Sequence, residues 1–185
     1  ADDDHPFTIA VDLDGTIVNR AGQITDRTRQ AIAALKERGI GVALASGRPY
    51  FSARSIIKDL NIREPSLFFA GALIVDPVNG VALRSRPLQF NEVRRLYQIG
   101  RVHGLATELY SSKDFWVEEF GELPRLHVEH YLTEAPRIAP FDQLQNGDEI
   151  LKVGFTVRAG SEQEKVARNL STQFPDLKFG VGYGA

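Results

Sequence analysis

Residues 7–16 read Phe-Thr-Ile-Ala-Val-Asp-Leu-Asp-Gly-Thr, and the prediction of the fold starts from them. The first five residues form an apolar, β-prone run that stops at Asp12, where a polar loop with a glycine begins. A short, continuous apolar run of this kind predicts a strand buried in a parallel sheet. Two carboxylates, Asp12 and Asp14, therefore stand at the carboxyl end of the predicted strand. That end is where open α/β sheets bind their ligands.

The first half of the chain alternates predicted strands with predicted helices. Thr25 and Asp26 are helix-capping residue types, and Gly39 is of the type that follows a helix end. Strand–helix–strand alternation predicts a doubly wound α/β domain with parallel strands. The predicted strands lie at 7–11, 41–45 and 67–70, and the predicted helices lie between Thr25 or Asp26 and Gly39 and over roughly 50–60.

The pattern changes after residue 71. Two β-prone runs, 72–75 and 81–84, flank Asp76-Pro77-Val78-Asn79-Gly80, which predicts a hairpin. Paired strands between helices then predict a second, α+β domain, so we divide the chain into 1–86 and 87–185. The elements predicted in this second part are helices at 91–103, 124–132 and 161–174 and strands at 106–110, 115–118, 150–157 and 177–181.

The composition is that of an ordinary globular protein. Hydrophobic residues make up 43% of the chain, and 22 Lys and Arg stand against 24 Asp and Glu. No basic run supports binding to nucleic acid or to a membrane surface, and no apolar run approaches the roughly 20 residues of a membrane helix. The absence of cysteine excludes disulfides and thiolate metal sites. Because the start lacks the features of a signal peptide, the expected location is the cytoplasm.

The two carboxylates after the first strand have a spacing suited to catalysis. Residues two apart in an extended chain point the same way, so Asp12 could act as a nucleophile while Asp14 serves as acid and base. Gly15 allows a sharp turn and lets backbone amides approach a phosphate. The alternative is that the acidic residues only form a turn or cap a helix.

Two short motifs resemble those of the haloacid dehalogenase (HAD) superfamily. Asp-Leu-Asp-Gly-Thr at 12–16 resembles the first motif, and Ser-Gly-Arg-Pro at 46–49, after the second predicted strand, resembles the second. The resemblance implies a HAD-like α/β core with an inserted α+β cap, and a phosphatase that forms an aspartyl-phosphate. Asp12 would be the nucleophile and Asp14 the acid and base. Both would bind Mg²⁺, Asp12 through its carboxylate and Asp14 through its backbone carbonyl.

The remaining residues of the two motifs are expected to bind substrate. In the family, the hydroxyl of the second motif and the amide that follows it hold the phosphoryl group, and a small hydroxyl beside a glycine amide suits an anion. The implied partner is a small phosphorylated metabolite such as a sugar phosphate, and the oligomeric state is left open. The expected phosphate- and substrate-binding residues are Leu13, Gly15, Thr16, Ser46, Gly47 and Arg48.

The Gly-Arg-Pro ending and the position of the second domain indicate a subgroup. They resemble the Cof-type sugar-phosphate phosphatases, whose C2-type cap follows the third core strand. That subgroup often carries Asn-Gly-Ala after this strand, where the present chain has Ala70-Gly71-Ala72, so no substrate contact from an asparagine is expected. Phosphomannomutase-like phosphotransferases share the first motif and a similar cap but lack the Gly-Arg-Pro form, so they rank second.

The third and fourth motifs of the family have no counterpart in this sequence. They are a lysine that neutralises the phosphate and a Gly-Asp-x-x-x-Asp type run that supplies further Mg²⁺ ligands. Asp148 and Asp176 precede predicted strands, whereas that run follows one, and Lys152 lies within a predicted cap strand. We therefore expect this chain by itself to be nearly inactive as a phosphatase and to bind Mg²⁺ weakly. A catalytically incomplete fragment or a binding module remains the alternative.

One further pair of histidines has metal-ligand spacing. His127 and His130, with Glu129 between them, lie on a short predicted helix, and two histidines at i and i+3 can share a metal. A polar helix face explains them better and is the preferred interpretation.

Overall fold

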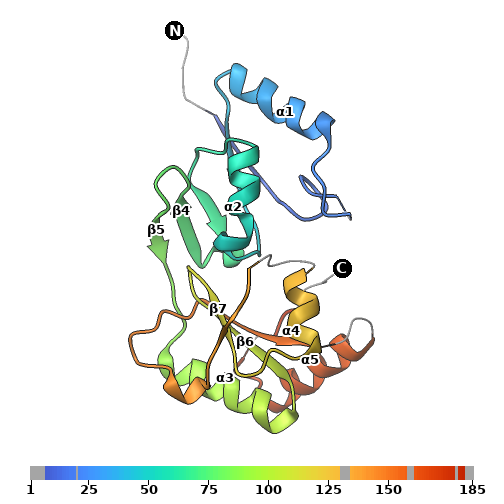
Figure 1. Cartoon of the computed structure of the whole chain (residues 1–185), viewed down its shortest axis with the longest axis vertical. Coiled ribbons are helices and arrows are strands. Elements are labelled where there is room, and N and C mark those ends of the chain that lie inside the picture. Colours follow the sequence, from blue (N-terminus) through green and yellow to red (C-terminus); the bar gives the residue numbers. More distant parts are fainter. Residues whose placement is uncertain (1–6, 20, 130–133, 158–160, 178, 182–185) are drawn as a thin grey trace.

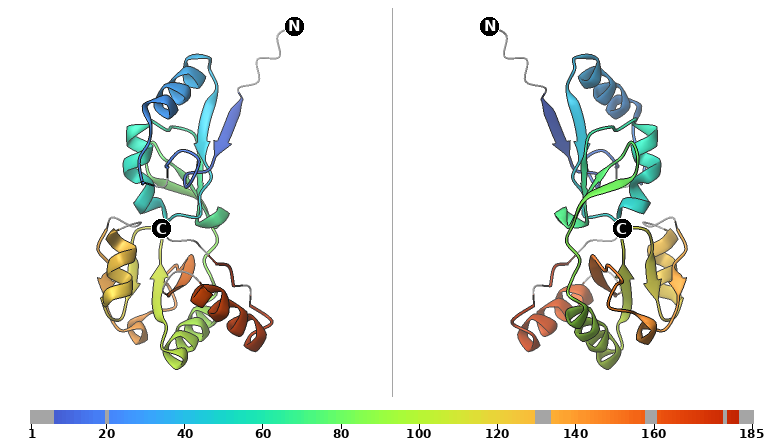
Figure 2. Two further views of the ribbon diagram at one scale, coloured as in Figure 1. Left: turned by 90° about the vertical axis from the view of Figure 1, so that its right-hand side faces the viewer. Right: turned by 90° about the vertical axis from the view of Figure 1, so that its left-hand side faces the viewer.

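The computed structural model describes residues 7–19, 21–129, 134–157, 161–177 and 179–181, which form an upper and a lower lobe in Figures 1 and 2. The upper lobe contains β1 (Thr8–Val11), α1 (Asp26–Glu37), β2 (Gly41–Leu44), α2 (Tyr50–Asp59), β3 (Ser66–Phe68), the 3-10 turn η1 (Phe69–Gly71), β4 (Leu73–Asp76) and β5 (Val81–Ser85). The lower lobe contains α3 (Phe90–His103), β6 (Ala106–Tyr110), β7 (Phe115–Val117), α4 (Glu122–His127), β8 (Arg137–Ile138), η3 (Phe141–Gln143), β9 (Lys152–Thr156) and α5 (Ser161–Gln173).

The upper lobe begins as a parallel sheet and continues as an antiparallel one. β1 pairs with β2 in parallel, and a parallel bridge between Ala45 and Leu67 links β2 to β3. β3, β4 and β5 then pair antiparallel, which confirms the predicted hairpin. The start of α1 is also as expected, because the Thr25 side chain accepts the Thr28 amide and caps the helix. The mixed α/β fold class is confirmed. The prediction that the first strand is buried is wrong, because β1 is an edge strand that pairs only with β2 among the described residues and leaves Thr8, Ile9 and Ala10 exposed.

The lower lobe is a four-stranded sheet in the order β8-β7-β6-β9. Its strands alternate their side chains between two faces, as pleated strands do. Leu109 and Trp116 point to the face that packs against Val93 and Tyr97 of α3. The opposite face carries Tyr110, Phe115 and Val117, which belong to the hydrophobic cluster of the upper lobe.

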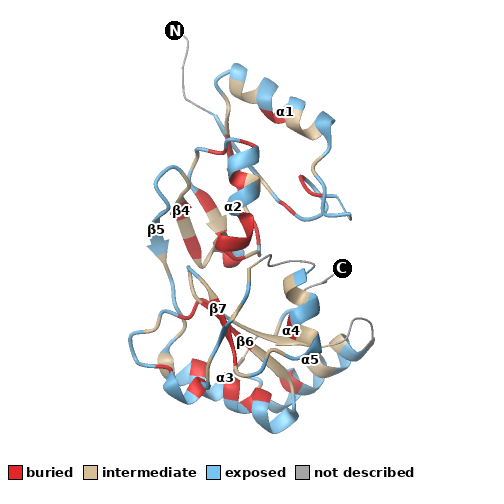
Figure 3. Ribbon diagram, in the orientation of Figure 1, coloured by how far each residue is buried: buried red, intermediate tan, exposed pale blue. Residues whose placement is uncertain are grey.

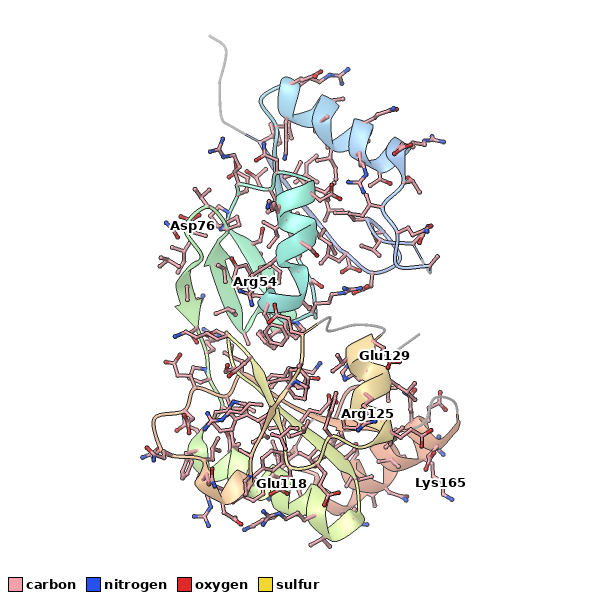
Figure 4. The ribbon with its side chains drawn as sticks, viewed as in Figure 1. Arg54, Asp76, Glu118, Arg125, Glu129 and Lys165 are labelled. Carbon is pink, nitrogen blue, oxygen red and sulfur yellow. The ribbon has the colours of Figure 1, made fainter. Side chains whose placement is uncertain are left out.

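One aromatic interface joins the two lobes. The ring of Phe51 on α2 stacks on Phe115 at a centroid distance of 6.1 Å, and Phe69 meets Tyr110 edge-on at 6.3 Å. All four residues are buried, as the red segments at the junction of the lobes in Figure 3 indicate. Arg54 of α2, labelled in Figure 4, adds an exposed ion pair to Glu134 at 2.9 Å. The lobes are therefore packed against each other as well as joined by the chain.

The prediction of a strand at 177–181 is wrong for the residues that the structure describes there. Leu177 and residues 179–181 form no ladder. Instead, Asp176 is ion-paired with Arg95 on α3, and the ring of Phe179 stacks on Phe155 at 6.5 Å. Side-chain contacts, in place of strand pairing, hold the described part of this segment against the lobe.

Three smaller differences concern element ends. The third strand stops at Phe68 because Phe69 and Ala70 have positive φ angles, which no strand residue adopts. The helix predicted at 124–132 is α4, which ends at His127, and residues 130–132 lie outside the described part of the chain. The strand predicted at 150–157 is shorter, and the two-residue β8 was not predicted.

The division into domains 1–86 and 87–185 is kept as a proposal, with β5 ending at Ser85 and α3 beginning at Phe90. None of the helices in the described part of the chain combines the length and the hydrophobicity needed to cross a membrane.

Replacing Glu118 with Gln should destabilise the lower lobe. Its carboxylate accepts hydrogen bonds from Arg101 at 3.0 and 2.6 Å and from the Phe141 amide at 2.9 Å, so it ties the residue after β7 to α3 and η3. Losing the charge in these bonds should lower the free energy of unfolding at pH 7 by about 1–2 kcal/mol. Denaturant unfolding of both proteins measures the difference, and Glu119→Gln, at an exposed neighbouring position, is the matched control.

The effect of Glu118→Gln should shrink in acid. The hydrogen bonds from Arg101 hold the pKa of Glu118 below its usual value. A lowered folded-state pKa gives stability that is complete above the unfolded value of about 4.3 and is lost as pH falls through the folded-state value. Equal losses for Glu118→Gln and Glu119→Gln, or a difference that does not shrink as pH falls below about 4, would contradict this account.

Candidate active site

The loop after β1 exposes two carboxylates on either side of a buried leucine. Leu13 between them is fully buried, whereas Asp12 and Asp14 are exposed. The loop closes on itself because the Val18 amide donates to the Leu13 carbonyl and the Gly15 amide donates to the Val18 carbonyl, both at 2.8 Å. Gly15 has φ +79°, a conformation that side chains disfavour. The exposed carboxylates therefore stand on a loop whose backbone is held in place.

The loop after β2 leaves the sheet beside the first. The Ala45 amide donates to the Val11 carbonyl at 2.9 Å, so the parallel ladder continues to the point where both loops begin. Ser46 follows, is 5% exposed, and accepts the Arg48 amide on its Oγ at 3.1 Å. Gly47 is exposed and lies just ahead of α2, whose N-cap is Pro49. The hydroxyl and amide expected to bind an anion thus stand at a helix start.

Arg48 connects the two loops directly. Its Nε donates to both oxygens of Asp14, at 3.1 and 2.8 Å, and its Nη2 donates to Oδ1 at 2.5 Å. This two-pronged arrangement is the strongest geometry for a guanidinium and a carboxylate. Asp12 makes a different contact, since its Oδ1 accepts the Leu13 amide at 2.8 Å. The structure therefore brings Asp14 and Arg48 together, while the roles of all the predicted site residues remain predictions.

A strained turn after β3 holds the second loop through two backbone hydrogen bonds. Phe69 and Ala70, which follow β3, have φ angles of +51° and +52°, and Gly71 has +95°. This backbone lets the Phe69 amide donate to the Arg48 carbonyl and the Ala70 amide donate to the Ser46 carbonyl, both at 3.1 Å. Non-glycine residues in this region cost free energy and persist where surrounding contacts hold them. Here the contacts fix the backbone of the expected phosphate-binding residues.

The oxygen donors at the strand end suit Mg²⁺ in type but are few. Carboxylate and carbonyl oxygens are the ligands that Mg²⁺ prefers, and Asp12 and Asp14 offer both. Within the described ranges there is no group of three or more acidic or histidine side chains placed to hold a metal. Asp12 and Asp14 could therefore hold Mg²⁺ only with water or phosphate completing its shell.

Three residues that could replace the third and fourth motifs, Asp148, Lys152 and Asp176, all lie in the lower lobe. Asp148 accepts the Gln145 amide at 2.7 Å and closes a turn, and Asp176 is paired with Arg95. Lys152 lies on β9, as expected, with its amino group 5.3 Å from the centre of the Tyr110 ring. Burial lowers the pKa of Lys152.

Sequence reasoning missed a buried polar cluster on the face of the lower sheet that looks toward the upper lobe. Glu108 is 1% exposed, and its Oε2 bonds Tyr110 Oη at 2.5 Å and His127 Nδ1 at 2.8 Å. Its Oε1 has no hydrogen-bond partner among the described residues. Burial, reinforced by Glu108, raises the pKa of Tyr110 well above its ordinary value. The signal was available, because Glu108 and Tyr110 alternate with Leu109 and so face the same side of the strand.

Comparison with known proteins gives consistent results. A family model described as haloacid dehalogenase-like hydrolase matches residues 9–181. The chain is 32% identical over 124 residues to the 5-amino-6-(5-phospho-D-ribitylamino)uracil phosphatase YwtE of Bacillus subtilis, covering 65% of this chain and 41% of that protein. It is 36% identical over 69 residues to the phosphatase YwpJ of the same species, covering 37% of this chain and 24% of that protein.

Solved structures agree in fold. A haloacid dehalogenase-like hydrolase from Bacteroides thetaiotaomicron superposes with a TM-score of 0.77 at 21% identity, covering 93% of this chain and 65% of that one. The HAD subclass IIB sugar phosphatase BT4131 superposes with a TM-score of 0.78 at 18% identity, covering 97% of this chain and 67% of that one. Identities this low show likeness of fold alone. The chain spans between 27% and 48% of the length of four curated relatives.

Replacing Ala70 or Ala72 with glycine should separate the free-energy cost of backbone strain in the turn after β3 from the cost of losing a methyl group. Ala70 is exposed with φ +52°, whereas Ala72 has φ −70°. Ala→Gly has the same effect on the unfolded chain at both positions, so the difference reports the folded backbone. We expect Ala72→Gly to be less stable than Ala70→Gly by about 1–2 kcal/mol, the cost of a left-handed residue with a Cβ, plus a smaller packing loss. Thermal unfolding measures this difference, and equal losses in the two variants would mean that the turn is unstrained.

Proposed function

Because the chain belongs to the haloacid dehalogenase-like hydrolases, a family in which its curated relatives are phosphatases, we propose that the loops after β1 and β2 form the site of a Mg²⁺-dependent phosphatase. The observation that carries the proposal is the joining of the two loops by the Arg48–Asp14 pair, at the carboxyl ends of parallel strands. Since the chain covers less than half of the curated relatives' length, the activity of the whole protein is part of the proposal.

Asp12 begins the proposed reaction. Its carboxylate attacks the phosphorus in line with the leaving oxygen and forms an aspartyl-phosphate. Asp14 donates a proton to the departing alcohol and then takes one from the water that hydrolyses the intermediate. The product is inorganic phosphate, and Asp12 is regenerated.

The second loop stabilises the transferring phosphoryl group. The Ser46 Oγ already accepts the Arg48 amide, so its own hydrogen is available to donate to a phosphoryl oxygen. The exposed Gly47 amide and the Arg48 guanidinium are further donors at the same strand end. Leu13, Gly15 and Thr16 shape the neighbouring first loop. Their amides donate to Asp12 Oδ1 and to the carbonyls of Val18 and Leu13, so the Thr16 hydroxyl is the donor that this loop offers to the phosphate.

Mg²⁺ is expected at the Asp12 carboxylate and the Asp14 backbone carbonyl. When bound, it offsets the repulsion between the nucleophile and the phosphate. Two unit charges 4 Å apart interact by about 4 kcal/mol at an effective dielectric constant near 20, so an unassisted approach of the phosphate to Asp12 is strongly disfavoured. Because the described residues supply few ligands, Mg²⁺ should bind weakly to this chain and hydrolysis should be slow.

The proposed substrate is a small phosphorylated metabolite such as a sugar phosphate. Its support is that the relatives act on phosphate esters of polyhydroxylated groups, the phosphoribityl compound of YwtE and the sugar phosphate of BT4131.

Replacing Asp12 with Asn should abolish hydrolysis, because an amide is a poor nucleophile. With an aryl phosphate and millimolar Mg²⁺, measured over hours to capture slow turnover, we expect a loss on the order of 10⁴-fold, or to the background rate. Asp26→Asn, at the exposed start of α1, is the matched control and should retain the rate. Phosphatase activity in Asp12→Asn, with deamidation excluded by mass spectrometry, would remove Asp12 from its proposed role.

Replacing Asp14 with Asn should depend on the leaving group. An alkyl phosphate needs a proton on its departing oxygen, so its hydrolysis should slow by about 10²–10⁴-fold. An aryl phosphate with an acidic phenol needs little help in this step and should be affected less. Comparing the two substrates under single-turnover conditions tests the role. Equal losses for both, or normal hydrolysis of the alkyl ester, would mean that Asp14 is not the acid.

A further inference from the structure

The Arg48 guanidinium is held on Asp14 rather than extended toward solvent. Its side chain is 14% exposed, while that of Asp14 is 44% exposed, so the cation is the more enclosed partner. Three N–H···O contacts between 2.5 and 3.1 Å join them. An enclosed guanidinium with a two-pronged carboxylate partner is well ordered, because the planar fork loses little freedom on binding.

The backbone of Arg48 is fixed as firmly as its side chain. Its amide donates to Ser46 Oγ, and its carbonyl accepts the Phe69 amide, both at 3.1 Å. The guanidinium therefore starts from the second loop and reaches across to the first. It lies between the proposed phosphate-binding groups and the proposed acid–base group, so both an incoming phosphate and Asp14 are within the range of one cation.

Carboxylate and phosphate oxygens compete for the same fork of donors. A guanidinium binds either anion with two parallel hydrogen bonds. Asp14 cannot present its oxygens fully to a leaving group while they accept three contacts from Arg48. Conversely, a phosphate that binds Arg48 must weaken the contact to Asp14.

We propose that the substrate phosphate takes Arg48 from Asp14, and that this exchange of ion-pair partners is what makes Asp14 available to the leaving oxygen. Arg48 is then a positioning residue with two states: it holds Asp14 in the substrate-free site and holds the phosphate in the loaded one. No covalent bond changes in the exchange. The inference rests on the proposed phosphatase site and adds an order of events to it.

The exchange predicts coupling between Asp14 and Arg48 in the binding of inorganic phosphate. In Asp14→Asn the guanidinium no longer has to leave the Asp14 carboxylate, so phosphate should bind on the order of 10-fold more tightly. Part of any gain comes from removing a negative charge near the anion. That part remains in an Arg48→Met background, whereas the part due to exchange disappears, so a gain there of about 3-fold or less is expected.

Isothermal titration of the purified chain with inorganic phosphate measures this cycle in four proteins: the native chain, Asp14→Asn, Arg48→Met and the double variant. Arg54→Met, which breaks the exposed Arg54–Glu134 pair, is the control and should leave the affinity unchanged. Thermal unfolding confirms that each variant is folded. If Arg48→Met does not fold, Arg48→Lys keeps the charge without the fork and should show an intermediate gain.

The Nε resonance of Arg48 gives a second readout. We expect it to shift when phosphate saturates the native chain, and to differ in the phosphate-free Asp14→Asn variant. Equal gains from Asp14→Asn in the two backgrounds, or an Arg48 resonance unmoved at saturation, overturns the exchange and leaves the phosphatase proposal standing. Failure of all four proteins to bind phosphate at tens of millimolar overturns the proposed site itself.

Discussion

The parallel pairing of β1 with β2 is the constraint on which the site depends. Val11 stands opposite Leu44, and the Ala45 amide continues the ladder to the Val11 carbonyl, so both strands end at one edge of the sheet. Parallel strands joined by a helix must end this way, because the crossover returns the chain in the same direction. The loops that begin at Asp12 and Ser46 therefore emerge side by side. A slip of one residue in this register would also move the buried side chains of β2 relative to β1, and the loops after Val11 and Leu44 would no longer begin opposite each other.

Local conflicts gather at the site, although one further left-handed non-glycine residue, Asn61, follows α2. Two non-glycine residues, Phe69 and Ala70, adopt left-handed conformations, and the enclosed cation of Arg48 sits on Asp14, whose side chain is close to half exposed. Each conflict has a compensating contact: the strained amides bond the carbonyls of the second loop, and the guanidinium has a two-pronged partner. Local strain of this kind is typical of functional sites, where geometry is selected above stability.

Local patterns were enough to predict much of the fold. The first two strands, the Thr25 cap and the hairpin at Asp76–Gly80 depend on residues close in sequence, and each was predicted within a residue or two. The expected strand at 177–181 failed because its position is set by distant partners, Arg95 and Phe155. The proximity of the two site loops followed from topology. The Arg48–Asp14 contact could not be predicted in this way, because the spacing of the motifs indicates which loops are neighbours but not which of their side chains make contact.

The aromatic contacts between the lobes bear on how this protein unfolds. Phe51 is 2% exposed and Phe115 is fully buried, and both belong to one hydrophobic cluster that draws on the upper and lower lobes together. A boundary near residue 86 divides the sequence, but it cuts through this cluster. Each half produced by such a cut would expose rings that the other half now covers, and exposed rings promote aggregation. The cooperative unit in hydrogen exchange should therefore span both lobes, so that amides of α2 and β7 exchange through the same global opening.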